Sequence, residues 1–255
     1  MNYLLLRDDE SLYYRLIDGT VTGPYLVFLH EGLGCVAMWK DFPDRLCAAT
    51  GCPGLVYDRR GYGRSSPLRG PRRIHYLHDY ALQELPQLLE GTIPGMPYIL
   101  VGHSDGGSIA LIHGAERPPL LQAIITVAAH VFVEPETLAG IEGAVLQYRS
   151  GRLRTLSAYH GDKTDSVFRA WSDTWLSPWF YPWNIEYLLR SIDCPLLVIQ
   201  GADDRYGTKR QVDSITSGTT GEATAVVMER CGHTPHQEQP DETLAVLSEY
   251  IEKCL

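Results

Sequence analysis

The sequence predicts an α/β protein in which a mostly parallel, eight-stranded sheet is covered by helices on both faces. The first reason is that apolar runs typical of buried strands alternate with segments of helical length. Four such runs lie at residues 25–29, 55–57, 98–101 and 121–128, with expected helices at 39–49, 74–89 and 107–116 between them. The second reason is that a chain of 255 residues is long enough for one large α/β domain. No apolar run is long enough to span a membrane.

Strands at both ends of the chain complete the expected sheet. Residues 3–6 and 12–17 are short apolar runs separated by a polar turn, which favours an antiparallel hairpin. The alternation resumes later with a strand at 195–200, a helix at 208–215, a strand at 223–228 and a closing helix at 240–253. We therefore expect a core formed by residues 1–130 and 194–255.

The intervening segment, residues 131–193, has no clear strand and is too long for a plain loop in a compact domain. We expect it to be a helical cap, with helices at 167–176 and 184–191. Four of the five tryptophans lie here, and Pro178 prevents one continuous helix through all four. The sequence pattern is compatible with tryptophans that pack within the cap and with tryptophans that line a ligand pocket. The candidates for substrate binding are Trp171, Trp175 and Trp179.

Composition excludes several classes of protein. The formal net charge of -9 argues against nucleic-acid binding, although six arginines fall within residues 59–73. For that stretch a structural turn with a solvated loop is favoured over an anion-binding patch. The start of the chain has no pattern of a secretory signal, and the six cysteines form no C-x-x-C pair. We expect a cytoplasmic protein without disulfides, metal, cofactor or membrane association; a homodimer is compatible with the sequence.

A tight serine turn is the clearest catalytic signal. Gly102-His103-Ser104-Asp105-Gly106 connects the apolar run at 98–101 directly to an expected helix, which is the context that the G-x-S-x-G nucleophile elbow requires. The glycines allow close backbone approach while the turn exposes the serine hydroxyl. The following helix adds amide donors where negative charge develops during acyl transfer. Ser104 is therefore the candidate nucleophile.

From residue 25 to the closing helix, the chain resembles the α/β-hydrolase family. In that family an acid and then a histidine follow the serine, each on a loop after a later strand. The resemblance selects Asp204, three positions after Gly201, over the adjacent Asp203, and it selects His233, which follows a glycine. It implies that His233 acts as the base and that Asp204 orients the imidazole. The spacing of these residues does not favour metal binding.

The resemblance also indicates an oxyanion loop and the turn Asp58-Arg59-Arg60-Gly61-Tyr62-Gly63-Arg64-Ser65, whose charged residues are usually structural. His30-Glu31-Gly32-Leu33-Gly34 is similar to the family's His-Gly loop, except that Glu31 stands where glycine is common. The implied amide donors are Gly32, with Leu33 as the next choice, and Asp105 after the nucleophile.

The family resemblance implies a hydrolase of small-molecule substrates. We expect cleavage of a carboxylic ester, lactone or thioester of a small to medium apolar or aromatic substrate through an acyl-enzyme on Ser104. The Ser104-Asp105 pair resembles that of valacyclovirase-type esterases, which implies that Asp105, together with Glu31, recognises a substrate cation; the simpler interpretation is that Asp105 caps its helix. The alternatives are a carbon–carbon bond hydrolase of aromatic degradation and a non-catalytic binding protein.

Overall fold

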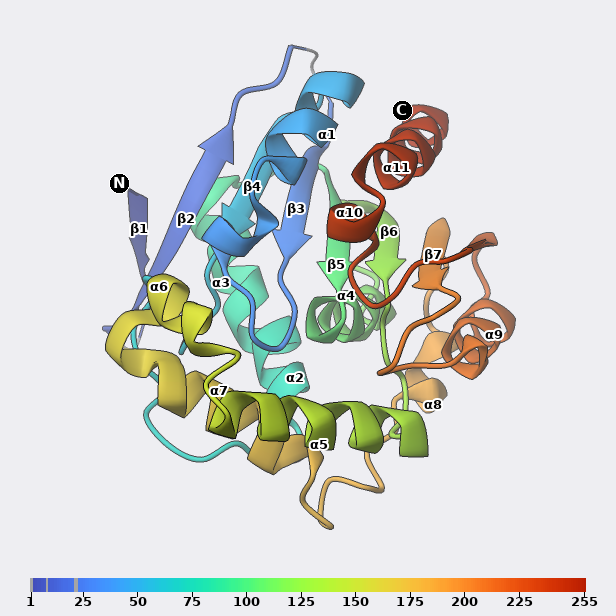
Figure 1. The fold of residues 1–255 in the computed structure, drawn as a ribbon. Coiled ribbons are helices and arrows are strands. Elements are labelled where there is room, and N and C mark those ends of the chain that lie inside the picture. Colours follow the sequence, from blue (N-terminus) through green and yellow to red (C-terminus); the bar gives the residue numbers. More distant parts are fainter. Residues whose placement is uncertain (1, 8, 21–22) are drawn as a thin grey trace.

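The computed structural model describes residues 2–7, 9–20 and 23–255 of the chain (Figure 1). Met1 of the predicted core and Asp8 of the predicted hairpin turn lie outside the described residues. Within them a single eight-stranded sheet runs in the order β1-β2-β4-β3-β5-β6-β7-β8. The strands are β1 (Asn2–Leu5), β2 (Ser11–Ile17), β3 (Tyr25–Leu29), β4 (Gly54–Tyr57), β5 (Tyr98–His103), β6 (Leu121–Val127), β7 (Leu196–Gly201) and β8 (Ala223–Met228).

The sheet is parallel except at its N-terminal edge, as predicted. β1 pairs with β2 and β2 pairs with β4 in antiparallel register, and the remaining neighbours are parallel. The central strand β5 is buried along its whole length, which explains its continuous apolar sequence. Parallel strands end at a common edge, so the loops after β3, β5, β6, β7 and β8 meet there.

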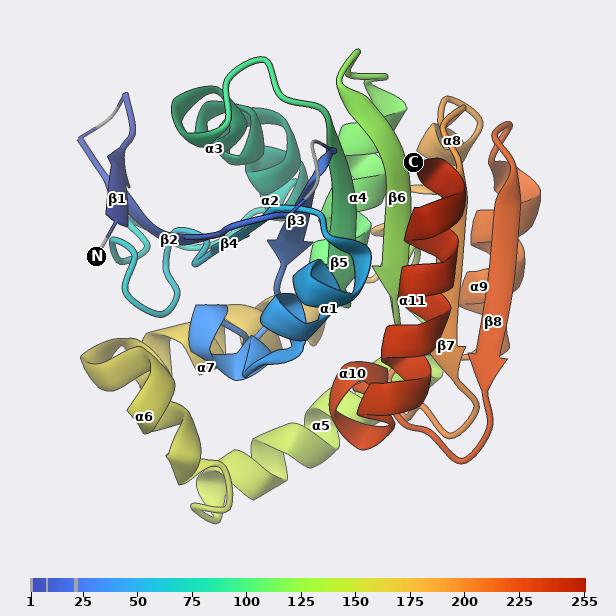
Figure 2. The same ribbon diagram turned by 90° about the horizontal axis from the view of Figure 1, so that it is seen from above.

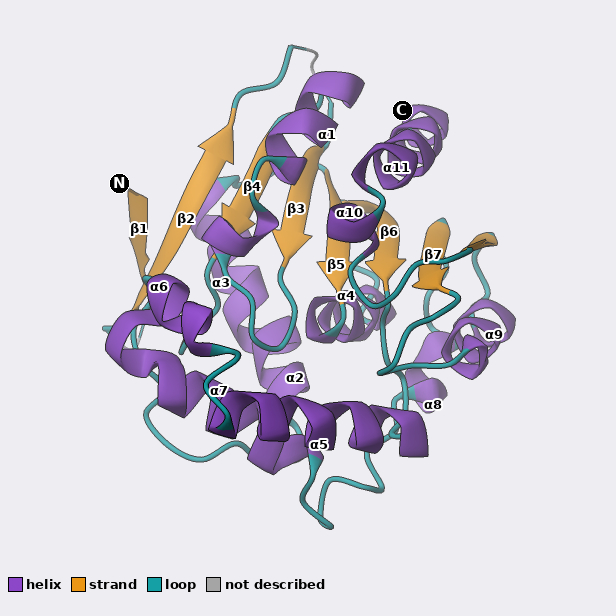
Figure 3. Ribbon diagram, viewed as in Figure 1, coloured by secondary structure: helices purple, strands orange, loops and turns teal. Residues whose placement is uncertain are grey.

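Helices cover both faces of the sheet (Figures 2 and 3). One face carries η1 (Val36–Trp39), α1 (Phe42–Thr50), α10 (Pro235–Glu238) and α11 (Pro240–Cys254); the other carries α2 (Tyr76–Asp79), α3 (Leu85–Thr92), α4 (Asp105–Ala115), α8 (Glu186–Leu189) and α9 (Lys209–Gly218). Each face has its own cluster of buried apolar side chains. Burial on both sides of the sheet therefore holds the strand ends in place beneath the site.

The predicted helix 74–89 is divided into three parts. A π-helical turn, η2 (Tyr80–Glu84), lies between α2 and α3. A π-turn accommodates one additional residue in a helix and changes which side chains share a face. Here it brings Tyr80 and Glu84 to the wall of a cavity next to the arginine-rich segment.

Most of the segment 131–193 lies beyond the carboxyl ends of the central strands (Figure 1), whereas its last helix, α8, packs against α4 and α9 on one face of the sheet. It contains α5 (Pro135–Arg149), η3 (Arg154–Leu156), α6 (Ser157–His160), η4 (Gly161–Lys163), α7 (Thr164–Trp175) and α8. The expected helix 167–176 corresponds to α7, whereas the expected helix 184–191 is shorter. The sequence did not predict α5. Two glycines interrupt its pattern and its buried residues are only Thr137, Ile141 and Ala144, so it has little helical periodicity.

Candidate active site

Ser104 lies in a strained turn between β5 and α4. Its φ is 52° and its ψ is -117°, a conformation that non-glycine residues rarely adopt. The flanking glycines are sterically required, because a Cβ at Gly102 would lie 2.3 Å from the Gly106 carbonyl oxygen and one at Gly106 would lie 2.0 Å from the Leu29 oxygen. The elbow therefore has the geometry that its sequence predicts.

The structure brings the three predicted triad side chains together. The distance from Ser104 Oγ to His233 Nε2 is 2.9 Å, and His233 Nδ1 lies 2.8 Å from Asp204 Oδ2. Because a carboxylate accepts, Nδ1 carries the proton, and Nε2 is left to accept the serine proton. This chain of hydrogen bonds is the arrangement needed to activate a serine hydroxyl.

Asp204 is held by several donors. Gln200 Nε2 lies 2.5 Å from Oδ2, and the Tyr206 amide donates to Oδ1 at 2.8 Å. Burial acts to raise the pKa of Asp204, but the charge and hydrogen bond of His233 and the Tyr206 amide outweigh it and leave the pKa below its ordinary value. The neighbouring Asp203 is exposed. Of the two aspartates, the structure places Asp204 against the histidine.

The predicted oxyanion loop follows β3 and is fixed from both sides. The buried His30 ring accepts the Arg59 amide at 3.1 Å, and the Tyr62 hydroxyl donates to the Gly32 carbonyl at 3.0 Å. A Cβ at position 32 would lie 2.4 Å from Cδ1 of Trp171, so the cap requires a glycine there. The Leu33 amide donates to the carboxylate of Glu31 at 2.5 Å.

Two of the predicted donors are free of competing bonds. The amides of Gly32 and Asp105 donate to no other residue in the described part of the chain. Asp105 is the first residue of α4, where helical amides lack intrahelical partners. Either amide is thus available to an anionic oxygen, whereas the Leu33 amide is available only after Glu31 moves.

The Asp105 side chain does not cap its helix, which corrects the simpler interpretation of the sequence. Ser104 occupies the N-cap position and no side chain caps there. The Asp105 carboxylate is 1% exposed and instead accepts a hydrogen bond from the Tyr76 hydroxyl at 3.0 Å. That hydroxyl in turn accepts from Trp175 Nε1 at 2.9 Å. Asp105 is therefore available as a pocket group rather than a cap.

A second carboxylate lies in the same cavity. Burial raises the pKa of Glu31 to about 6, and the Asp105 carboxylate adds to the rise, against the Leu33 hydrogen bond and the attraction of His233. Glu31 lines the same cavity as Ser104 and His233.

The cavity above Ser104 has a volume of about 270 Å³ and lies between the strand ends and the cap. Trp171 and Trp175 line it, as does Glu31, but Trp179 does not and its side chain is 45% exposed. The predicted substrate contact of Trp179 thus has no support in the structure. The complete lining consists of Glu31, Leu33, His103, Ser104, Asp105, His130, Thr137, Ile141, Trp171, Trp175, Tyr206, His233 and Thr234.

Several of these lining residues are not predicted from the sequence, and His130 is the most notable of them. Its Nε2 lies 2.9 Å from the Tyr206 carbonyl, so Nε2 carries the proton. Burial lowers the pKa of His130, and its Nδ1 has no hydrogen-bond partner among the described residues. Its position shortly after β6 is the signal that was available, because ligands bind beyond the carboxyl ends of parallel strands.

The other nearby histidines have structural positions. His103 Nε2 lies 2.8 Å from the His233 carbonyl, and burial lowers the pKa of His103 well below its ordinary value. His236 is buried against Trp39 and Phe42, as expected of a packed histidine. Among the described residues, no group of three or more His, Cys, Asp or Glu side chains has the arrangement of a metal site. No helix among them is long and apolar enough to cross a membrane.

Curated proteins with similar sequences are lipases and a peptidase. Human monoglyceride lipase is 24% identical over 97% of this chain and 88% of its own length. Proline iminopeptidase from Lactobacillus helveticus is 26% identical over 94% of each protein. The mouse sn-1-specific diacylglycerol lipase ABHD11 is 30% identical over 119 residues, which are 46% of this chain and only 36% of that protein.

Solved structures share the fold at low sequence identity. The meta-cleavage product hydrolase CumD from Pseudomonas fluorescens IP01 superposes with a TM-score of 0.79 at 14% identity, over 100% of this chain and 98% of that one. The sequence itself matches the alpha/beta hydrolase family over residues 26–246, a range that includes the elbow, the oxyanion loop and both partners of Ser104. This chain therefore belongs to the alpha/beta hydrolase family.

Proposed function

We propose that this hydrolase cleaves a carboxylic ester, lactone or thioester through an acyl-enzyme on Ser104. The observation that carries the proposal is the continuous hydrogen-bonded chain from Ser104 through His233 to Asp204. The lipase names of two relatives support an ester substrate. The bond to the leaving oxygen or sulfur breaks in the step that forms the acyl-enzyme.

Each step has a group in place. As Ser104 Oγ attacks the carbonyl carbon, His233 Nε2 takes its proton and Asp204 stabilises the imidazolium. The amides of Asp105 and Gly32, which have no competing acceptor among the described residues, hold the anionic oxygen. His233 then gives the proton to the leaving group, and a water activated by His233 in the same way hydrolyses the acyl-enzyme and regenerates Ser104.

The shape and lining of the cavity support the proposed class of substrate. A volume of about 270 Å³ with Trp171, Trp175 and Ile141 in its walls suits a small to medium apolar or aromatic group. Hydrolysis of p-nitrophenyl esters should therefore be fastest for short acyl chains and should decline as the chain lengthens. Equal or increasing rates with long acyl chains would contradict this assignment of substrate size.

A fluorophosphonate probe tests the proposed nucleophile. The probe reacts with an activated serine, so it should label the wild-type protein and leave Ser104→Ala unlabelled, with labelling measured by intact mass. Asp203→Asn is the matched control and should be labelled like the wild type. A folded wild-type protein that is not labelled would indicate a non-catalytic binding protein.

The two cavity carboxylates support a finer proposal on substrate charge. Glu31 and Asp105 both line the cavity, and an ammonium group on the acyl or alcohol part of a substrate would be attracted to them. The test compares kcat/KM for a neutral ester and its α-amino analogue. Asp105→Asn should reduce the preference for the amino analogue, and an unchanged ratio would refute charge recognition by this residue.

A further inference from the structure

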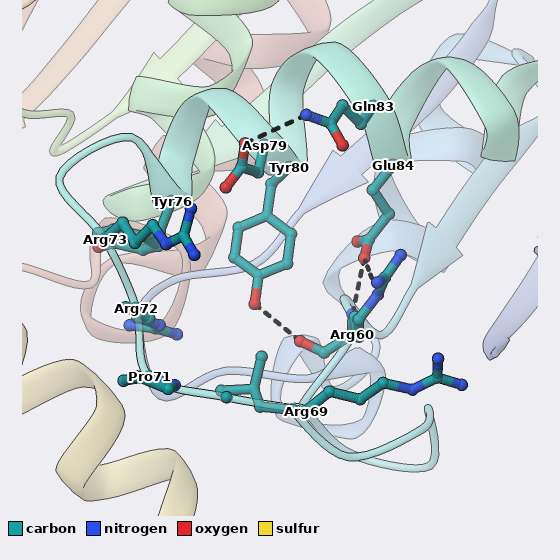
Figure 4. A pocket seen from close by; sticks show the side chains of 12 residues that line it. Arg60, Arg69, Pro71, Arg72, Arg73, Tyr76, Asp79, Tyr80, Gln83 and Glu84 are labelled. Atoms are coloured by element: carbon teal, nitrogen blue, oxygen red, sulfur yellow. Dashed lines mark hydrogen bonds and ion pairs between the residues drawn. The ribbon is translucent and has the colours of Figure 1, made fainter. Parts of the chain in front are cut away.

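The arginine-rich stretch 59–73 is more ordered than a solvated loop. Arg60 and Arg69 form ion pairs with the buried Glu10 at 2.6 Å and 2.5 Å. Figure 4 shows Arg60 directed toward Glu84, whereas Arg72 and Arg73 lie at the other end of the same cavity, beside Tyr76. Arg60 and Arg69 thus share the Glu10 carboxylate, whereas Arg72 and Arg73 lie away from it.

Arg72 differs from its neighbours because its guanidinium reaches the surroundings of the candidate active site. Nη2 donates to the Tyr62 hydroxyl, and Nη1 donates to the Ala170 carbonyl of α7 at 3.2 Å. The guanidinium carbon also lies 4.3 Å from the centre of the Tyr76 ring. One side chain therefore contacts the cap and two tyrosines, of which Tyr62 reaches Gly32 and Tyr76 reaches Asp105.

The first connection runs to the oxyanion loop. Tyr62 accepts from Arg72 and donates to the Gly32 carbonyl at 3.0 Å, so both functions of its hydroxyl are used. A peptide unit is planar, and fixing the Gly32 carbonyl fixes the plane of the bond that joins Gly32 to Leu33. Arg72 thereby restrains Gly32 from its carbonyl side, while the preceding peptide unit, which carries the Gly32 amide, is held by the Arg59 guanidinium, which donates to the Glu31 carbonyl at 2.8 Å.

The second connection runs to Asp105. Arg72 stacks on the face of Tyr76, an interaction between a cation and an aromatic ring. Tyr76 donates to the Asp105 carboxylate and accepts from Trp175, and burial raises the pKa of Tyr76 well above its ordinary value, so its hydroxyl keeps the proton that it donates. The position of Asp105, which provides the other proposed oxyanion amide, is thus also linked to Arg72.

We propose that Arg72 is a positioning residue that holds the two oxyanion donors and the cap helix α7 in one arrangement for catalysis. The planar guanidinium donates in two directions while its face stacks on Tyr76, which a lysine ammonium cannot reproduce. The inference rests on the proposed serine-hydrolase function, because it assigns to Arg72 an effect on the oxyanion site.

The matched pair of variants is Arg72→Ala and Arg73→Ala. The exposed Arg73 side chain makes no hydrogen bond or ion pair with another residue in the described ranges. Arg72→Ala should lower kcat for a p-nitrophenyl ester by roughly 10- to 100-fold, the scale of a small displacement of catalytic groups, with KM nearly unchanged. Arg73→Ala should match the wild type. Circular dichroism establishes that both variants fold.

Tyr62→Phe separates positioning from a general loss of packing, because it removes only the hydroxyl that connects Arg72 to Gly32. It should lower kcat, and adding Arg72→Ala to it should cost less than the product of the two single effects. Arg72→Lys provides a variant if the alanine form does not fold, and it should also lose kcat.

Three outcomes would overturn the inference: a kcat of folded Arg72→Ala or Arg72→Lys within about twofold of wild type, a loss confined to KM, or fully multiplicative effects with Tyr62→Phe. Fluorophosphonate labelling distinguishes the two proposals. A wild type that is not labelled overturns the proposed function and this inference together, whereas equally fast labelling of wild type and Arg72→Ala overturns only the role of Arg72.

Discussion

Replacing Asp204 by asparagine tests the proposed mechanism most directly, because it changes one atom in a fully enclosed group. The Asp204 side chain has no exposed surface. Its Oδ1 accepts the Tyr206 amide, so an asparagine would place its carbonyl oxygen there and its NH₂ group where Oδ2 now faces His233. The NH₂ group donates, and it would therefore hold His233 with the proton on Nε2.

That tautomer cannot take the proton of Ser104. The expected result is a fall in kcat of about 10⁴-fold, the loss found when the same exchange is made in other serine triads. The corresponding increase in the activation barrier is about 5 kcal/mol. Because asparagine has nearly the same volume and Asp204 keeps its backbone contacts, KM should change little.

The assay is steady-state hydrolysis of a short p-nitrophenyl ester, with Asp203→Asn as the control. Asp203 is adjacent in the chain, exposed and of the same chemical type, so its variant should keep wild-type activity. The proposed role of Asp204 is wrong if Asp204→Asn retains more than about a tenth of the wild-type kcat, or if Asp203→Asn loses as much activity as Asp204→Asn.

Three further predictions follow from other contacts. Burial raises the pKa of Glu31 to about 6, so the negative charge of Glu31 opposes the developing oxyanion only above that pH. Glu31→Gln should therefore raise kcat/KM for a neutral ester roughly 3- to 10-fold above this pKa and leave kcat/KM unchanged below it. A ratio of variant to wild-type kcat/KM that stays constant with pH would contradict this prediction. Gly106→Ala should lower the free energy of unfolding, measured in urea, by more than about 3 kcal/mol, because the new Cβ would lie 2.0 Å from the Leu29 carbonyl oxygen. A decrease below about 1 kcal/mol would show that the turn tolerates a Cβ at this position. Burial also raises the pKa of Glu84 to about 8, so the folded state binds this proton more tightly than the unfolded chain. The contribution of protonated Glu84 to the free energy of unfolding is full below the ordinary pKa of 4.5 and is lost as pH rises through about 8. Glu84→Gln should therefore flatten the decline in Tm over that pH range. Parallel curves of Tm against pH for the wild type and the variant would contradict this prediction.

The features that depend on local sterics and on hydrophobic periodicity could be predicted from the sequence alone. Strand and helix lengths alternate in a way that leaves few arrangements besides a covered parallel sheet. The glycines around Ser104 specify the elbow because the turn tolerates no Cβ at either position. The order of Ser104, Asp204 and His233 then assigned the triad through the family resemblance, and the structure brings these three side chains together.

The tertiary structure decided which side chains face the cavity. Trp171 and Trp175 are four residues apart on α7 and share a face, but Trp179 follows the end of that helix and turns toward solvent. Asp105 accepts from Tyr76, which lies 29 residues earlier in the chain. Local pattern carries no information on such a pairing, so it predicted a helix cap instead.

The same limit applies to the arginine-rich stretch and to α5. Arg72 contacts Ala170, 98 residues later, and nothing in the neighbouring sequence distinguishes it from the exposed Arg73. α5 contributes Thr137 and Ile141 to the cavity although its own helical pattern is weak. Chain order and local sterics therefore fix the serine turn and the sheet, whereas the residues that line the cavity and support its walls depend on distant segments that meet only when the cap packs on the core.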